Sequence, residues 1–140
     1  MAELHLNTGL VELDPDECFR LLAQQAIGRL AVVGEGGRLE IFPVNYLLSG
    51  RRVLFWTDAG TKLTASTGRG VVFEIDSADH EAETGWSVIV RGVARQWDPR
   101  QFPNKPSTWV RSVKPFLVAI DPIEVTGRRV PAGGRPSSGG

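Results

Sequence analysis

The chain has 140 residues, which is enough for one domain with a sizeable core. Sixteen basic residues balance sixteen acidic ones, so we expect neither a nucleic-acid nor a membrane partner, and the single cysteine excludes an intramolecular disulfide. No apolar run approaches the ~20 residues of a membrane helix and no secretory signal is visible, which predicts a cytoplasmic protein.

The first element expected is a helix, after an arm over residues 1–12 that shows no hydrophobic period. Asp14 is a good N-cap, Pro15 suits the first helical position, and Glu17 completes a capping box. Apolar residues at helical spacing give this helix one buried face. Gly28 stands where a left-handed residue could end it.

After this helix the pattern becomes that of strands. Six β-patterned segments are predicted at 29–33, 38–48, 52–57, 71–76, 85–97 and 116–125. Pro43 implies an edge or a bulge in the second strand, and Gly92 is the expected bulge of the fifth. A short helix is expected over 61–67. Few helices and many short strands favour a single antiparallel barrel domain over 13–130.

Two segments are predicted to lack regular structure. Residues 98–114 carry three prolines and no helical period, so they are expected to form a loop. Residues 131–140 have the composition of a disordered tail.

The segment TDAGTK, residues 57–62, holds the components of an anion site. The hydroxyls of Thr57 and Thr61 and the ammonium of Lys62 flank a glycine before the short helix, and such groups suit a phosphate. The segment matches neither GxGxxG nor GxxxxGK[ST]. An ordinary strand-to-helix turn capped by Asp58 or Thr61 explains the spacing equally well.

The strand IFPVNYLL, residues 41–48, is apolar on both faces. Alternation places Val44 and Tyr46 on one face and Pro43 and Asn45 on the other. Such a strand suits a barrel wall whose outer face meets a partner subunit. Asn45 and the backbone near Pro43 could bind the polar edge of a ring, although Asn45 satisfying a bulge is the simpler interpretation.

Trp86 and Ser87 open the longest strand, where an indole could stack on a ring and a hydroxyl could bond to it. A core edge or an interface is the alternative for both. Catalytic candidates are scarce, since no metal-ligand spacing and no GxSxG elbow occurs, and Cys18 suits a buried helix face. Chemistry would then depend on a cofactor.

Taken together, the segments GRLAVV, PVNY, VLFWTDAGTKL, VVFEID, GWSVIVRGVAR and VTGRR resemble the pyridoxamine 5′-phosphate oxidase-like, FMN-binding split-barrel proteins. The resemblance covers about residues 13–130 and is closest to the short oxidase-related members. It implies a mostly β fold, a six-stranded antiparallel Greek-key split barrel with a few short peripheral helices. It also implies a homodimer with FMN at the subunit interface, acting as an oxidoreductase on an unidentified small molecule.

The resemblance also assigns the cofactor-binding residues. The flavin ring would lie along the strand that holds Pro43, Val44, Asn45 and Tyr46. The phosphate would be held by Thr57, Thr61 and Lys62. Trp86 and Ser87 would approach the flavin from the other subunit. Thr61 replaces a second basic residue of the true oxidase. The segment that grips the vitamin B6 substrate has no clear equivalent after VTGRRV, so that activity is not expected.

Alternatives remain within and outside this fold. The deazaflavin F420 would need cations for its acidic tail, for which Arg51, Arg52 and Arg69 are candidates. A non-enzymatic flavin carrier, sensor or storage module would need only the cofactor site. Haem binding is disfavoured because no histidine occurs in the C-terminal half after residue 80. Single-stranded nucleic acid could stack on Phe55 and Trp56, but the zero net charge opposes it.

Overall fold

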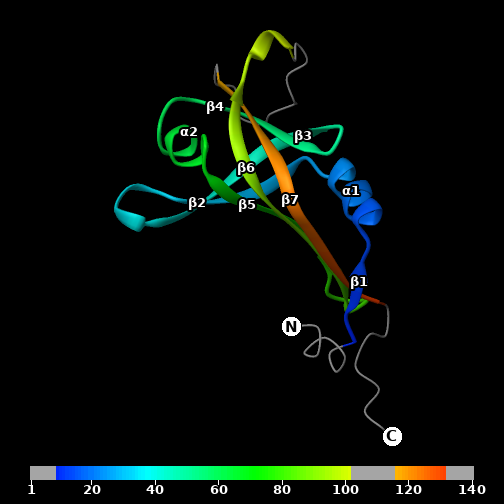
Figure 1. Cartoon of the computed structure of the whole chain (residues 1–140). Helices are drawn as coiled ribbons and strands as arrows, with labels where there is room; N and C mark the ends of the chain where they lie inside the picture. Colours follow the sequence, from blue (N-terminus) through cyan, green and yellow to red (C-terminus); the bar gives the residue numbers. More distant parts are fainter. Residues whose placement is uncertain (1–8, 102–115, 132–140) are drawn as a thin grey trace, which may run out of the picture.

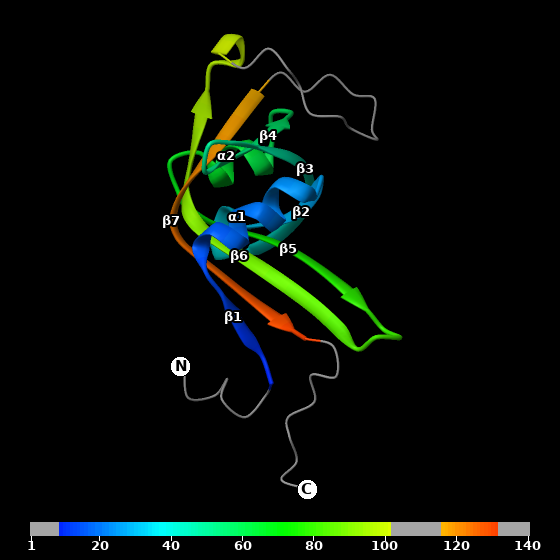
Figure 2. The same cartoon turned by 90° about the vertical axis from the view of Figure 1, so that its right-hand side faces the viewer.

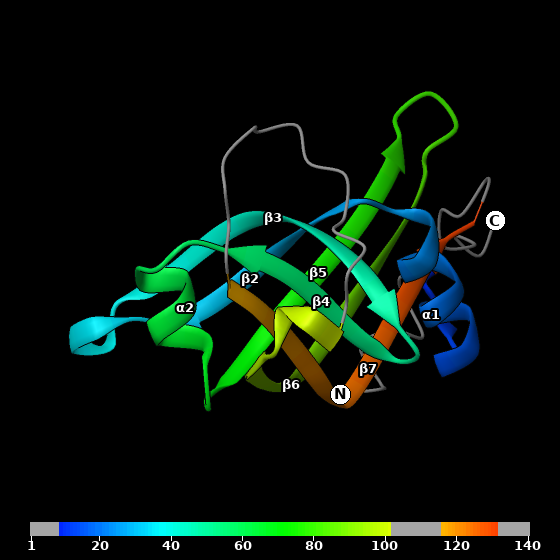
Figure 3. The ribbon, with the colours of Figure 1, turned by 90° about the horizontal axis from the view of Figure 1, so that it is seen from above.

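Six antiparallel strands close into a barrel in the computed structural model, which describes residues 9–101 and 116–131 (Figure 1). The strands are β2 (Ile27–Val33), β3 (Leu39–Ser49), β4 (Arg52–Thr57), β5 (Gly70–Asp79), β6 (Thr84–Trp97) and β7 (Phe116–Val130). Their order around the barrel is β7-β4-β3-β2-β5-β6, and β6 pairs with β7 to close it. Figure 3 shows this ring of strands from above. The predicted mostly β, six-stranded antiparallel barrel is confirmed.

Helix α1 (Pro15–Gln24) begins as predicted, because the Asp14 side chain accepts a hydrogen bond of 2.8 Å from the Glu17 amide. The prediction that Gly28 ends the helix is wrong, since the chain is already extended at Gln25. Gly28 lies inside β2, where an added Cβ would stand 2.2 Å from the Phe73 ring. The glycine is therefore needed for packing rather than for a left-handed turn.

The short helix α2 (Thr61–Ser66) follows β4 and covers one end of the barrel (Figure 2). Its inner side is buried at Ala65 and Ser66. Thr67, which follows the helix, forms an isolated bridge with Ala94 of β6. This bridge fixes the end of α2 against the far part of β6.

Several strands extend further than their sequence patterns indicate. Strand β5 continues to Asp79 and β7 to Val130, so the β5–β6 hairpin and the end of β7 project beyond the barrel (Figure 2). A short strand β1 (Val11–Leu13) pairs with this end of β7, at the boundary of the expected arm. Pairing across a neighbouring strand stabilised these polar ends where local hydrophobicity gave no signal.

The two strand irregularities expected from the sequence are present. Around Pro43, β3 pairs with β2 only, because its pairing with β4 starts at Tyr46, so proline occupies a local edge. The register of β6 against β7 shifts between Arg91 and Gly92, which is the predicted bulge. The bulk of the predicted loop over 98–114 and the predicted tail lie outside the described residues.

The main core fills the barrel and includes Phe55, Phe73 and the buried side of α1. A smaller cluster lies on the other face of β4 and β7, formed by Leu54, Trp56, Leu117 and Ala119. No helix among the described residues is long and apolar enough to span a membrane.

Candidate functional site

The three predicted phosphate residues lie at the junction of β4 and α2. Thr57 ends β4 and is almost fully buried, and its hydroxyl donates to the Asp58 carbonyl at 3.1 Å. Thr61 is exposed at the first position of α2. The Lys62 ammonium lies 5.8 Å from the centre of the Phe42 ring on β3, in the range of a cation–π contact. One hydroxyl and one cation at this junction therefore face towards the surface.

The strand predicted to meet the ring divides between core and surface. Val44 and Tyr46 are buried in the barrel. The Tyr46 hydroxyl donates to the Leu22 carbonyl at 2.6 Å, so this side chain holds α1 on the barrel. Pro43 is exposed and Asn45 is half-buried on the opposite face. A ligand on the outer face could thus contact the side chains of Pro43 and Asn45.

Trp86 and Ser87 point to opposite faces of β6, as neighbouring residues of a strand do. Trp86 packs partly against the main core and lies across from Arg129 on β7. Ser87 is half-buried and lies across from Arg128. The guanidinium of Arg128 forms no ion pair with a described residue, and sequence reasoning did not single it out.

A single chain does not bring the predicted phosphate residues close to Trp86 and Ser87. The end of α2 contacts β6 at Ala94, whereas Trp86 lies earlier on the same strand, about 25 Å away at ~3.3 Å per residue. Figure 1 shows α2 and the free end of the β5–β6 hairpin at opposite ends of the molecule. The phosphate residues and the Trp86–Ser87 pair of one protomer therefore belong to different places on its surface.

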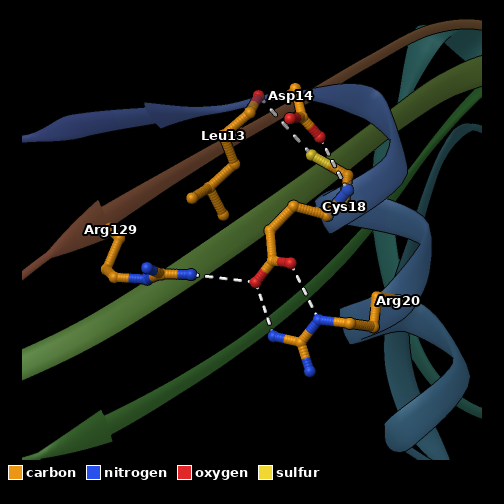
Figure 4. Close-up of polar contacts among 6 residues, drawn as sticks. Leu13, Asp14, Cys18, Arg20 and Arg129 are labelled. Carbon is orange, nitrogen blue, oxygen red and sulfur yellow. Dashed lines mark hydrogen bonds and ion pairs between the residues drawn. The ribbon is translucent and has the colours of Figure 1, made fainter.

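The end of β7 opposite Trp86 is fixed to α1 by Glu17 (Figure 4). The Arg129 guanidinium donates to the Glu17 carboxylate at 2.9 Å, and Arg20 donates to the same carboxylate. Hydrogen bonds from Arg20, and then the charge of Arg129, lower the pKa of Glu17. This ion-pair cluster orients the strand segment that carries Arg128 and Arg129.

A charged cluster on the outer face was missed by sequence reasoning. The Arg29 guanidinium of β2 lies 2.6 Å from the Glu74 carboxylate and 3.2 Å from that of Asp76, both on β5. Burial raises the pKa of Glu74, and a hydrogen bond with Asp76 raises it further. Arg29 is also the register partner of Pro43. A partly buried cluster of one guanidinium and two carboxylates thus lies near the predicted ring strand.

Apolar side chains gather on the outer face of the sheet next to this cluster. Four large aliphatic residues are exposed there: Val33, Leu39, Ile41 and Ile123. Leu39 is 80 % exposed, an unusual value for a leucine inside a strand. A groove of about 540 Å³ runs between Leu39 and Ile123 over the strands β2, β5 and β6. Contiguous apolar surface of this kind is typical of an interface.

Comparison with known proteins matches nearly the whole barrel. A family model described as pyridoxamine 5′-phosphate oxidase matches residues 14–129. The chain is 38% identical over 136 residues to an uncharacterized protein of Mycobacterium tuberculosis, covering 90% of this chain and 89% of that one.

Solved structures agree with this match. A structure of an FAD binding protein from Mycobacterium smegmatis is 39% identical, with a TM-score of 0.67, covering 86% of this chain and 97% of that one. A second FAD-binding protein, from Mesorhizobium loti, has a TM-score of 0.75 at 19% identity, covering 87% of this chain and 99% of that one, and shows the fold alone.

Proposed function

Because the chain belongs to the pyridoxamine 5′-phosphate oxidase family, we propose that it binds a flavin and acts as a flavin-dependent oxidoreductase on an unidentified small molecule. The observation that carries this proposal is the family match over residues 14–129, which includes every predicted cofactor-binding residue. The similar Mycobacterium smegmatis structure is that of an FAD binding protein, which supports a flavin as the cofactor.

The residues present fit the phosphate end of such a cofactor. Thr61 offers an exposed hydroxyl, and Lys62 offers an ammonium 5.8 Å from the centre of the Phe42 ring. A phosphate carries close to two negative charges at neutral pH, and donors of this kind are those that bind it in proteins. Thr57 is buried, so we assign it to shaping the loop, with its hydroxyl bonded to the Asp58 carbonyl.

The ring end of the cofactor would meet the outer face of β3. Pro43 and Asn45 present their side chains there, while Val44 and Tyr46 would contribute backbone atoms only, because their side chains lie in the core. The flavin, when bound, supplies the electron-transfer chemistry. The protein binds and orients it, and the ion pair of Arg29 with Glu74 lies beside this face, since Arg29 is the register partner of Pro43.

We further propose that the site is completed by a second copy of the chain. Trp86 and Ser87 lie about 25 Å along β6 from the position of α2, so one protomer cannot place them beside its own Lys62. The exposed aliphatic residues Leu39, Ile41 and Ile123 supply the apolar surface that a homodimer would bury.

Two other functions could use the same site, and both remain proposals. F420 shares a ring and a phosphate with FMN but needs further cations for its acidic tail. A flavin carrier or sensor needs only the binding residues and no substrate pocket. Turnover of reduced flavin by candidate substrates separates a carrier from an oxidoreductase.

The first experiment is an absorption titration of the purified protein with FMN, FAD and F420. A shifted flavin band that saturates at micromolar cofactor is the expected result. Absence of binding by all three cofactors would overturn the proposed function while leaving the family membership unchanged. Saturation by F420 alone would replace the flavin by the deazaflavin.

A further inference from the structure

A polar pocket of about 500 Å³ lies beside the predicted phosphate residues and shares only Thr61 with them. It lies between helix α2 and the turn that joins β2 to β3. Its lining residues are Val33, Gly34, Glu35, Gly36, Gly37, Thr61, Thr64, Ala65 and Arg69. Its volume lies within the range of small-molecule sites. Because Thr61 belongs both to this pocket and to the phosphate residues, the two places are adjacent.

Arg69 is the cation of this pocket. Most described arginines are held in ion pairs, whereas Arg69 forms none with a described residue. Its backbone is fixed nevertheless: its amide donates to the Ser66 carbonyl at 3.0 Å, and its carbonyl accepts from the Ala94 amide at 3.1 Å. A guanidinium on a fixed backbone, with no protein carboxylate bound to it, is suited to an anionic ligand group.

The other two arginines considered for a cofactor tail are already engaged elsewhere. Arg51 pairs with Asp16, and Arg52 pairs with Asp121 at 2.6 Å. Arg51 immediately precedes β4 and Arg52 is its first residue, so they lie six and five positions before Thr57 at its end, about 17 to 20 Å away at ~3.3 Å per residue. Only Arg69 of the three lies on the α2 side of the barrel.

We propose that this pocket receives the adenosine monophosphate half of FAD, extending from the flavin phosphate held near Thr61 and Lys62. The inference rests on the proposed function, because it requires a flavin at the neighbouring site. It goes further in naming FAD, rather than FMN or F420, as the cofactor and in assigning residues to its second half.

The mixed chemistry of the walls favours a nucleotide over an oligoglutamate tail. Arg69 and the Thr61 hydroxyl are donors for a phosphate, and the Glu35 carboxylate is an acceptor for ribose hydroxyls or an adenine amino group. Val33 is an exposed aliphatic side chain of the lining that a base could contact. A tail of carboxylates would instead meet the negative charge of Glu35, which makes F420 the poorer occupant.

The test compares FAD with FMN on the intact protein by calorimetric titration, because the two ligands differ only by this half. We expect the wild type to bind FAD more tightly than FMN. Arg69→Gln should weaken FAD about tenfold or more, the scale of a lost charge-assisted hydrogen bond, and leave FMN within twofold. Arg95→Gln, which removes an exposed arginine paired with Asp121, is the matched control and should change neither.

A second variant narrows the pocket without replacing a charged residue. Gly34 has an extended backbone (φ −85°, ψ −167°) that any residue adopts, and a Cβ there would lie 3.4 Å from the Arg38 carbonyl oxygen, 3.5 Å from Cγ of Glu40 and 3.8 Å from the Thr61 methyl, which are van der Waals distances. Gly34→Val should therefore fold, keep FMN affinity and lose the preference for FAD.

The outcomes separate the two proposals. Equal effects of both variants on FAD and FMN, or no effect on either, would overturn the pocket assignment while flavin binding stands. F420 binding that depends on Arg69, with no FAD preference, would overturn the choice of nucleotide. No flavin binding by the wild type would overturn the proposed function and this inference with it.

Discussion

The Tyr46 hydroxyl donates a 2.6 Å hydrogen bond to the carbonyl of Leu22, in the last turn of α1. Carbonyls in the last turn of a helix have no partner within the helix, so this buried bond satisfies a group that burial would otherwise leave unpaired. The Tyr46 ring also meets Phe73 edge to face, with centroids 4.8 Å apart. Tyr46 therefore joins α1 to the barrel core, although the sequence places it in the segment predicted to meet a cofactor.

Tyr46→Phe should lower the free energy of unfolding by about 1 to 3 kcal/mol, because it leaves a buried carbonyl unsatisfied while keeping the ring. Urea denaturation measures the change. Flavin affinity, measured under conditions in which the variant is fully folded, should stay within twofold of the wild-type value. A loss of flavin affinity without a loss of stability would assign the hydroxyl to the cofactor instead.

Gly92→Ala should destabilise the barrel by about 1 to 3 kcal/mol, the range of an overpacked core. At this bulge a Cβ would lie 2.2 Å from the Asp121 carbonyl oxygen, and backbone cannot move aside as a flexible side chain does. Gly70→Ala is the matched control in the paired strand, since an added Cβ there would lie 4.0 Å from its nearest neighbour, the Gly92 carbonyl oxygen. Equal thermal midpoints for the two variants would contradict this explanation of the bulge.

Local patterns predicted the barrel but not the full length of its strands. The helix cap at Asp14, the bulge at Gly92 and the edge at Pro43 each depend on the chemistry of a few neighbouring residues, and each is found. The extension of β7 to Val130 depends on pairing with a distant strand, which no local pattern records.

The same limit applies to the candidate site. The residues of the β4–α2 junction are adjacent in sequence and could be predicted together. The cluster of Arg29 with Glu74 joins residues 45 positions apart, and the pocket at Arg69 joins a turn to a helix. Only the closed barrel brings such groups together, so no local pattern predicted these clusters, although Arg69 by itself was a candidate for the tail of F420.

Leu39→Arg should convert the proposed dimer to a monomer, because it places a charge in the exposed aliphatic surface of β3. Light scattering after size-exclusion chromatography measures the mass. Val11→Arg is the control, as Val11 is an exposed aliphatic residue on β1, outside this surface. A wild-type protein that is monomeric at tens of micromolar would contradict the dimer.

Glu17→Gln should lower the free energy of unfolding at neutral pH and change it little in acid. Arg20, and next the charge of Arg129, lower the pKa of Glu17 in the folded state, so its contribution is present above the unfolded pKa and is lost as pH falls through the folded value. The difference in unfolding free energy between wild type and variant should therefore shrink between pH 7 and pH 3. Glu81→Gln, in the exposed β5–β6 turn, should show no such trend.

Lys62→Ala should weaken FMN binding by about 1 to 3 kcal/mol, the range for a hydrogen bond to a charged group and for the desolvation left when it is lost. Riboflavin provides the sharper comparison, because it has the same ring and no phosphate. If Lys62 binds the phosphate, its replacement should abolish most of the preference for FMN over riboflavin and leave riboflavin affinity unchanged. The ammonium also lies 5.8 Å from the centre of the Phe42 ring, and Lys62→Ala removes this cation–π contact as well. Lys62→Arg keeps the positive charge and should retain part of the preference. An undiminished preference for FMN in Lys62→Ala would move the phosphate away from this junction, whatever the affinity for the ring.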